Sequence, residues 1–200
     1  MGPFEEMPAM PDIDPGTSTA EPSWVGEVIR FWFEELTENQ WYATSESIDS
    51  TIRDRFSSLR ERLVTEDGSG VTEPRRILAT VIVLDQFSRN LFRGDSRAYA
   101  ADSIALWLAR KAIDMRIDIG MKKQERLFLY HPFEHSENRE DQALALHLIA
   151  QLGNEEWTHS AMTHKVVIDR FGRFPHRNAI LSRLSTADEI VFLDEPKNSF

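Results

Sequence analysis

Apolar residues recur at intervals of three and four along most of the chain after residue 22, which is the pattern of amphipathic helices. The clearest stripe contains Ile48, Ile52, Phe56, Leu59 and Leu63. Strict alternation of apolar and polar residues, the signature of a strand, is absent. We therefore predict an all-α protein. The helices are expected at about 23–36, 46–64, 74–91, 97–115, 122–130, 137–152, 155–172, 178–184 and 187–193.

Proline and capping residues set several of these boundaries. Pro74 suits the first turn of a helix, whereas Pro132 is expected to end one. Ser136 is the expected N-cap of the helix over 137–152. Pro175 disfavours helical geometry in the residue before it, so the helix over 155–172 must end there. The last helix is expected to open with a capping box at Thr186-Ala187-Asp188-Glu189.

The segment from Ile77 to Leu84 is almost entirely apolar, so the helix over 74–91 is predicted to be central. Short loops between the helices indicate neighbours that run antiparallel. We expect residues 23–200 to form one domain, an array of antiparallel helices.

Residues 1–22 differ from the remainder in composition. They hold five of the nine prolines and five acidic residues, with no Lys or Arg. Few large apolar side chains are available to form a core, so a disordered acidic tail is predicted. A linker or extension is the preferred interpretation over a partner-binding arm.

Overall composition excludes several functional classes. The net charge of −10 disfavours binding to nucleic acid or anionic lipid. The chain has no cysteine, so disulfides and thiolate metal sites are excluded. It has no membrane-spanning apolar run and no secretory signal, and a cytoplasmic location is expected. Nucleotide-binding, EF-hand and zinc-finger motifs are missing, and we predict no cofactor.

A short pattern, Asp-x-Phe-x-Arg, occurs twice, each time late in a predicted helix. The copies are Asp85-Phe87-Arg89 and Asp169-Phe171-Arg173. They are consistent with either a remnant repeat or chance similarity. Further Arg and Asn residues follow each copy, and a His follows the second, in an otherwise acidic chain.

Guanidinium groups match the paired oxygens of carboxylates and phosphates, so these two segments predict an anion-binding cleft if they face each other. The expected partner is a small anionic ligand or an acidic peptide terminus. A structural role is the alternative, because Asp and Arg four residues apart pair within a helix and cations stabilise helix C-termini. The predicted ligand-binding residues are Asp85, Arg89, Asn90, Arg93, Arg173, His176, Arg177 and Asn178.

Another candidate segment runs from His131 to Glu137. His135 and Glu137 are a possible acid–base pair beside a helix N-terminus. Ser136 lacks a nucleophile elbow and is interpreted as a cap. The spacing of His131 and His135 is not that of a zinc protease, and His164 is expected to be a core histidine. A metal site of these three histidines is considered, but no metal is predicted.

Five stretches together resemble the bacterial family called domain of unknown function 924. They are Phe31-Trp32-Phe33, LDQFSRNLFRG (84–94), LYHPFEHSE (129–137), RFGRFPHRN (170–178) and STADEIVFL (185–193). The resemblance covers about residues 24–193 and implies an all-α, tetratricopeptide-like, right-handed superhelix. It implies no activity. Its motifs contain the polar set above together with Gln86, His135, Ser136 and Glu137. Family members usually have Pro where Ser88 stands.

Three functional hypotheses follow. The first is a binding protein in which Arg89, Arg173 and Arg177 contact an anion. The second is an enzyme, a hydrolase or transferase with an anionic substrate, in which His135 or His176 is the acid–base group and Glu137 orients it. The third is a protein-interaction module whose arginines are purely structural. Catalysis requires His135 and Glu137 in one pocket with the arginines, within about 8 Å.

Overall fold

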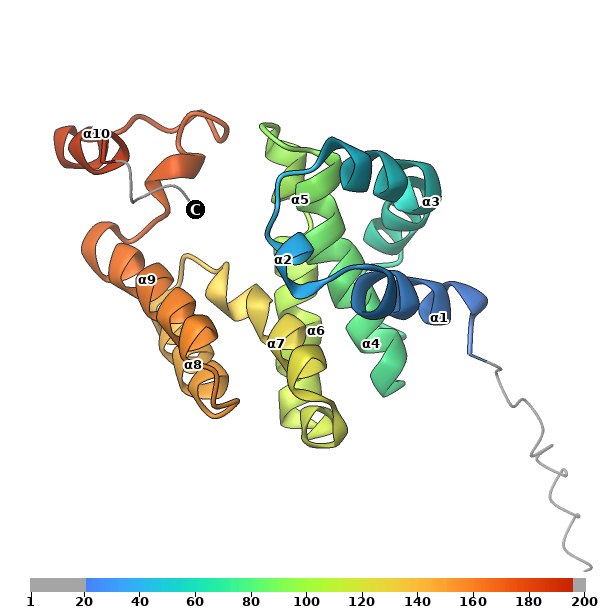
Figure 1. Cartoon of the computed structure of the whole chain (residues 1–200). Helices are drawn as coiled ribbons and strands as arrows, with labels where there is room; N and C mark the ends of the chain where they lie inside the picture. The colour runs from blue at the N-terminus through green and yellow to red at the C-terminus, as the bar shows by residue number, and fades with distance from the viewer. Residues whose placement is uncertain (1–20, 196–200) are drawn as a thin grey trace, which may run out of the picture.

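A computed structural model describes residues 21–195, which contain helices and turns but no β-strand. Figure 1 shows the helices side by side, from α1 and α3 at one end to α8, α9 and α10 at the other. The α-helices are α1 (Ser23–Arg30), α2 (Glu38–Trp41), α3 (Glu46–Thr65), α4 (Pro74–Val81), α5 (Ser88–Leu91), α6 (Asp102–Asp114), α7 (Lys123–Glu134), α8 (Arg139–Ala150), α9 (Glu155–Phe171) and α10 (Ala187–Leu193). Two π-helical turns are η1 (Phe31–Glu35) and η2 (Ile82–Phe87), and three 3₁₀ turns are η3 (Ser96–Ala98), η4 (Ile117–Gly120) and η5 (Pro175–Arg177).

The centre of the fold is the continuous helical segment α4–η2–α5, which runs from Pro74 to Leu91. It packs against α1, α3, α6 and α7. Every side chain from Ile77 to Ser88 is buried. The prediction of a central helix over 74–91 is therefore confirmed.

Aromatic side chains join the outer helices to this segment. Phe87 lies 4.9 Å from Phe56 of α3 and 5.6 Å from Trp32 of η1, measured between ring centroids. Trp32 also meets Phe128 of α7 edge-on at 5.3 Å. Fully burying one such ring contributes about 1.5–3 kcal/mol, so this cluster fixes the positions of α1, α3 and α7.

The π turns were not expected from the sequence. In a π turn the backbone bond spans five residues instead of four, which rotates the following helical face relative to the preceding one. In η2 both Asp85 and Gln86 are buried on the side that faces α7. The turn thus brings two adjacent polar residues to one wall of the interior.

The C-terminal part has its own small core. Helices α8 and α9 pack together and α8 packs against α7. Val167 and Ile168 of the last part of α9 form, with Phe174 and Phe192, an apolar cluster separate from the main one. This cluster holds α10 and η5 against the end of α9.

Two predicted boundaries around α7 and α8 are wrong. Helix α7 continues through Pro132 to Glu134, because proline's fixed φ is helical and only one backbone bond is lost near the end of a buried helix. Helix α8 begins at Arg139, and its N-cap is Asn138, which accepts hydrogen bonds from the next amides. Ser136 instead donates its hydroxyl to Asp141 of α8 at 2.8 Å.

Two further segments differ from expectation. The helix predicted over 97–115 begins at Asp102, after the separate turn η3, because Tyr99–Ala101 form turns. The short helix predicted over 178–184 is replaced by turns, in which Ser182 has a φ of 55° that a helix does not allow. The remaining expected helices are observed within a few residues of their predicted ends, and the capping box of α10 is present at Thr186 and Glu189.

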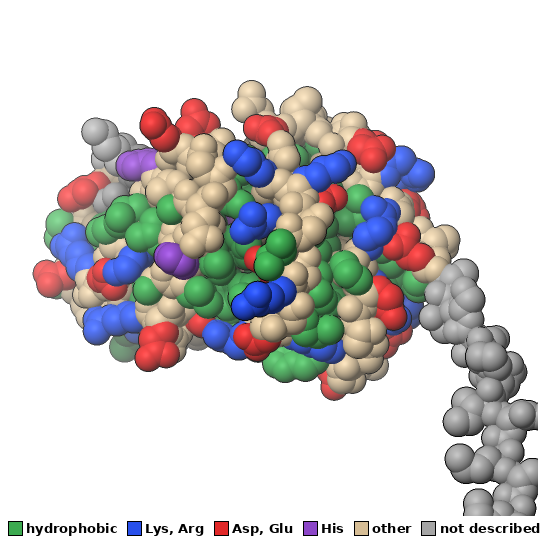
Figure 2. Space-filling model, turned by 90° about the horizontal axis from the view of Figure 1, so that it is seen from below, with side chains coloured by type: hydrophobic (Ala, Val, Ile, Leu, Met, Phe, Trp, Pro, Cys, Tyr) green, Lys and Arg blue, Asp and Glu red, His purple; other side chains and the backbone are tan. Residues whose placement is uncertain are grey.

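The all-α class is confirmed. The right-handed, tetratricopeptide-like arrangement and the single domain over 23–200 stay predictions, and the tail predicted at 1–22 falls almost wholly outside the described residues. No helix within 21–195 is long and apolar enough to cross a bilayer. On the face shown in Figure 2, basic and acidic side chains alternate around exposed apolar ones, without a field of one sign.

Candidate functional site

A cavity of about 350 Å³ opens where the C-terminal ends of the central helix and α7 meet the middle of α9. Its remaining wall is the end of α2. Side chains that can carry charge or exchange protons dominate the lining. The lining residues are Trp41, Tyr42, Ala43, Gln86, Arg89, Asn90, Arg93, His131, Glu134, His135, Ser160 and His164.

A carboxylate–histidine pair lies at the back of this cavity. Asp85 is fully buried, and its Oδ1 lies 2.8 Å from Nδ1 of His135. Arg89 Nη1 lies 3.1 Å from the same carboxylate, and Gln86 Nε2 donates to its other oxygen at 2.6 Å. The buried carboxylate is therefore bonded on both oxygens.

This environment fixes the charge state of the pair. Burial alone would raise the pKa of Asp85, but Arg89 and His135 outweigh it and hold that pKa well below its usual range. Burial and the nearby Arg89 charge lower the pKa of His135 to about 3, against the opposing effect of Asp85. Because Asp85 is ionised, Nδ1 of the neutral His135 carries the proton. Its Nε2 is then an unprotonated base.

A second carboxylate–histidine pair faces the same cavity. Glu134 Oε1 lies 3.0 Å from Nδ1 of His164 and accepts the Ser160 hydroxyl at 2.8 Å. Burial would raise the pKa of Glu134, but the hydrogen bond and charge of His164 lower it to about 2. Burial lowers the pKa of His164, and Glu134 more than compensates, so its net shift is upward. The two histidines thus have pKa values displaced in opposite directions.

Three imidazole rings form a row along the cavity. The ring centroids of His131 and His135 are 5.5 Å apart, and those of His135 and His164 are 6.2 Å apart. Burial lowers the pKa of His131, whose Nδ1 lies 3.3 Å from Gln86 Nε2. Within residues 21–195, no group of three or more His, Cys, Asp or Glu side chains is arranged to hold a metal ion.

Arg89 and Arg177 come from the two sequence segments that were predicted to face each other, and they meet at Asp102. Arg89 binds both oxygens of Asp102 at 3.1 Å, and Arg177 Nη1 lies 3.8 Å from Asp102 Oδ2. Both guanidinium groups also lie over the ring of Tyr99, at 5.8 and 4.7 Å. Asp102 therefore serves as a common counter-ion for both segments.

Arg93 forms the outer basic wall of the cavity. Its Nε and Nη2 bind both oxygens of Asp49 in α3, at 2.6 and 3.0 Å. Asn90 donates to the same carboxylate at 2.8 Å. Nη1 of Arg93 donates to no other described residue, and 39% of the side chain is exposed. Arg93 thus keeps N–H groups for a ligand.

An adjoining hollow of about 250 Å³ shares one wall with the cavity, formed by Tyr42, His131, Glu134 and Ser160. Its other lining residues include Glu38, Glu156 and Trp157. The two hollows therefore meet at His131 and Glu134. Beyond this shared wall, the cavity is lined by arginines and the adjoining hollow by glutamates.

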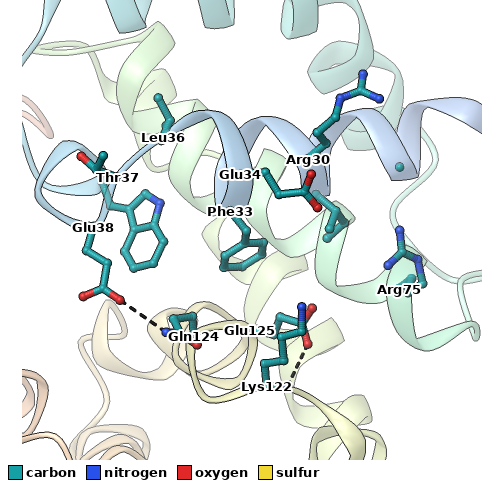
Figure 3. Close-up of a pocket in the computed structure, with 13 residues that line it drawn as sticks. Arg30, Phe33, Glu34, Leu36, Thr37, Glu38, Arg75, Lys122, Gln124 and Glu125 are labelled. Carbon is teal, nitrogen blue, oxygen red and sulfur yellow. Dashed lines mark hydrogen bonds between the residues drawn. The ribbon is translucent and has the colours of Figure 1, made fainter.

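Another hollow lies on the far side of α2, between η1 and the start of α7, and shares Glu38 and Trp41 with those two. Figure 3 shows Phe33 on its floor and Gln124 and Lys122 below. Gln124 Nε2 donates to Glu38 at 3.3 Å, so this glutamate already has a partner from α7. Positive and negative side chains alternate around this hollow. The histidine–carboxylate pairs do not line it.

Comparison with known proteins places the chain in a family. The model of a family described as "Bacterial protein of unknown function (DUF924)" matches residues 28–197. The chain belongs to the DUF924 family. A solved structure from Agrobacterium tumefaciens, of a protein of unknown function, superposes with a TM-score of 0.77 and 33% sequence identity. The match covers 86% of this chain and 97% of that one. No curated protein matches the chain.

The DUF924 motifs divide between two places. Asp85, Arg89, Asn90 and Arg93 of the stretch 84–94 lie in or beside the cavity, as does His135 of the stretch 129–137. The stretch 170–178 does so only through Arg177, which is buried and donates to the His135 carbonyl at 3.1 Å. The structure thus brings together only part of the predicted ligand-binding set.

The other polar residues of the stretch 170–178 hold the chain near α10. Arg173 binds both oxygens of Glu189 in α10, at 2.6 and 2.8 Å, and does not pair with Asp169. The intrahelical pair of Asp169 and Arg173 that the structural alternative requires does not form, because Gly172 takes a left-handed φ of 69° and turns the chain out of α9. Asn178 donates to the same Glu189 at 3.2 Å, and the His176 ring packs against Phe174.

Glu137 is also engaged away from the cavity. Arg183 binds both of its oxygens at 2.6 and 3.0 Å, and the amide of Phe174 donates to it at 2.8 Å. Its pKa is lowered, because burial is outweighed by these bonds. The carboxylate beside His135 is that of Asp85 and not that of Glu137, so the expected pairing of His135 with Glu137 does not form.

Sequence reasoning missed three acidic residues of the site. Glu134 lies within the family motif from Leu129 to Glu137, so membership of that motif could have marked it as a candidate site residue. Asp49 and Asp102 lie in stretches without a motif, and only the three-dimensional packing shows them. His164, expected in the core, lines the cavity and pairs with Glu134.

Proposed function

We propose that the cavity binds a small ligand carrying a carboxylate or phosphate group. The supporting observation is the open basic wall, where Arg93 lies beside Asn90 and Arg89 around a hollow of about 350 Å³. Arginine N–H groups suit paired anionic oxygens, and neutral imidazoles add directional hydrogen bonds. The first hypothesis named Arg89, Arg173 and Arg177 as the anion contacts. Arg89 remains a candidate, whereas Arg173 is bound to Glu189 and Arg177 to Asp102 and the His135 carbonyl. Arg93, also in the predicted set, is the better candidate in their place.

The charge balance limits the expected affinity. Arg89 already pairs with Asp85 and Asp102, and Arg93 pairs with Asp49. A ligand would use the N–H groups that these pairs leave unused, so one or two charge-assisted hydrogen bonds are available. Each contributes about 1.5–3 kcal/mol, which is compatible with a small metabolite bound at moderate strength.

Calorimetric titration with phosphate, succinate, acetate and a short acidic peptide tests the proposal. We expect at least one to bind, and Arg93→Gln to weaken that binding by about tenfold to a hundredfold through loss of a charged contact. Circular dichroism would establish that the variant is folded.

Arg97→Gln is the matched control. Arg97 also binds an aspartate through Nε and Nη2, at Asp95, and does not line the cavity. It should leave binding unchanged. Absence of binding by every probe, or equal losses in the two variants, would contradict the proposal.

An acid–base enzyme is the second candidate, favoured by the two histidines with oppositely displaced pKa values. His135 is held neutral, with Nε2 as base, whereas His164 favours the protonated form beside Glu134. Opposite shifts of this kind are typical of acid and base partners. An anionic substrate near Arg89 would raise the low pKa of His135 toward neutrality, where a base is most effective.

Nitrogen-15 NMR of the imidazole groups tests this candidate. At about pH 5 we expect His135 to be neutral, with its proton on Nδ1. At a pH equal to the ordinary histidine pKa of about 6.5, we expect more than half of His164 to be protonated, because its pKa is raised. Addition of a bound anion should raise the His135 pKa. Two histidines that titrate together near the ordinary value would contradict an acid–base pairing.

A further inference from the structure

The cavity and the adjoining hollow carry opposite charges at their outer ends. Arg93 and Asn90 line the cavity and not the hollow, whereas Glu156, in the first turn of α9, lines the hollow and not the cavity. Their shared wall lies between these ends. A ligand that occupied both would therefore meet a cation at one end and an anion at the other.

The inner charges along this path are already neutralised. Arg89 is paired with Asp85 and Asp102, and Glu134 is paired with His164. Glu38, at the rim of the hollow, keeps its negative charge, but one of its oxygens accepts a hydrogen bond from Gln124 (Figure 3). At the basic end the unused Nη1 of Arg93 remains for a ligand. At the acidic end Glu156 is the glutamate with both side-chain oxygens unengaged by other described residues.

Glu156 is exposed, and its side chain forms no hydrogen bond or ion pair with another residue of the described part of the chain. Two aromatic residues, Tyr42 and Trp157, line the same hollow. Aromatic faces and a carboxylate together favour an ammonium group over an anion. This end would therefore repel a second carboxylate.

We propose that the ligand is a linear zwitterion, with its carboxylate at Arg93 and Asn90 and its ammonium group at Glu156. This inference rests on the proposed function and adds the substrate class. Asn39 and Ser160 supply polar groups between the two ends, which suits the amide of a short peptide as well as the chain of an ω-amino acid. Both sources share the same terminal chemistry.

Calorimetry with matched probes tests the inference on the full chain. The probes are hexanoate, 6-aminohexanoate, alanyl-alanine, and the N-acetylated and C-amidated forms of that dipeptide. We expect at least one zwitterion to bind about tenfold or more tightly than its counterpart lacking the amine, because the ammonium group gains a charged hydrogen bond. C-amidation should also weaken binding.

Glu156→Gln should abolish the advantage of the zwitterion and leave hexanoate binding unchanged. Glu155→Gln is the matched control, since Glu155 is the preceding residue of the same helical turn but lines neither hollow. It should preserve the advantage. Preference for the dipeptide or for 6-aminohexanoate would identify which source is used.

Equal binding of amine-bearing and amine-free probes would overturn the zwitterion inference and leave anion binding intact. The same holds if Glu156→Gln has no effect. If neither these probes nor phosphate and succinate bind, the proposed function fails, and the inference fails with it.

Discussion

At the scale of single residues, the energetic centre of the site is the buried carboxylate of Asp85. Its neighbours donate to both oxygens, and its interaction with Arg89 and His135 outweighs the unfavourable burial. A buried ion pair contributes little relative to apolar packing, but removing one partner leaves the other charge uncompensated.

Asp85→Asn should therefore destabilise the fold by about 3–5 kcal/mol, because Arg89 would lose one of its two counter-ions and an amide donor would face Gln86. Urea unfolding followed by circular dichroism measures the change. Asp95→Asn, which removes an exposed partner of Arg97, should cost much less. Equal losses would show that Asp85 is not the buried centre of the network.

Some of these contacts could be predicted from the sequence, and others could not. The pair between Asp85 and Arg89 follows from helical spacing and is observed at 3.1 Å. The pair between Arg93 and Asp49 joins residues 44 positions apart, for which no local rule exists. Motifs therefore identify reactive side chains, while their partners depend on how helices pack.

At the scale of elements, helical periodicity located most helices, because one face of each is buried and the pattern records that burial. It could not show the π turn η2, since one extra residue in a turn leaves no trace in the almost entirely apolar run that leads into it. That turn determines that Asp85 and Gln86 both face α7.

The continuation of α7 through Pro132 has a similar origin. A local rule ends the helix at proline, but residues Leu127–Glu134 are all buried and packing maintains the helix. As a result His131, Glu134 and His135 leave the same helical end toward one cavity. A helix that stopped before Pro132 would have separated them, so the error in the boundary also obscured the site.

At the scale of the whole molecule, the displaced pKa values predict how stability depends on pH. The pKa values of His131, His135 and His176 are lower than in an unfolded chain, with that of His176 at about 4 through burial and Arg177. Below about pH 6.5 the unfolded chain binds more protons at these sites, so stability falls as the pH falls.

Two carboxylates extend this loss to lower pH. The pKa of Glu134 is lowered to about 2, and that of Glu189 to about 2 chiefly by Arg173. Their contribution is present above the unfolded value and is lost as the pH falls toward 2. His164 acts oppositely, since its raised pKa gives stability that is lost as the pH rises through that value.

We therefore expect the free energy of unfolding to be greatest near neutral pH and to decrease steadily toward pH 4, as measured by urea denaturation at a series of pH values from about 4 to 8. His135→Gln should flatten the acid slope. His147→Gln, on the exposed side of α8, should not. A stability that stays constant or rises on acidification would contradict the assigned charge states.

The position of Asp102 has a consequence for how such a sequence can evolve. Arg89 and Arg177 share this one carboxylate, although they lie 88 residues apart in the chain. A substitution that removed the carboxylate would leave the buried Arg177 without its counter-ion and Arg89 with Asp85 alone, so two like charges would share one fewer negative group. Among relatives, drift at these three positions should therefore be correlated, and any lineage that has lost one should have replaced the others.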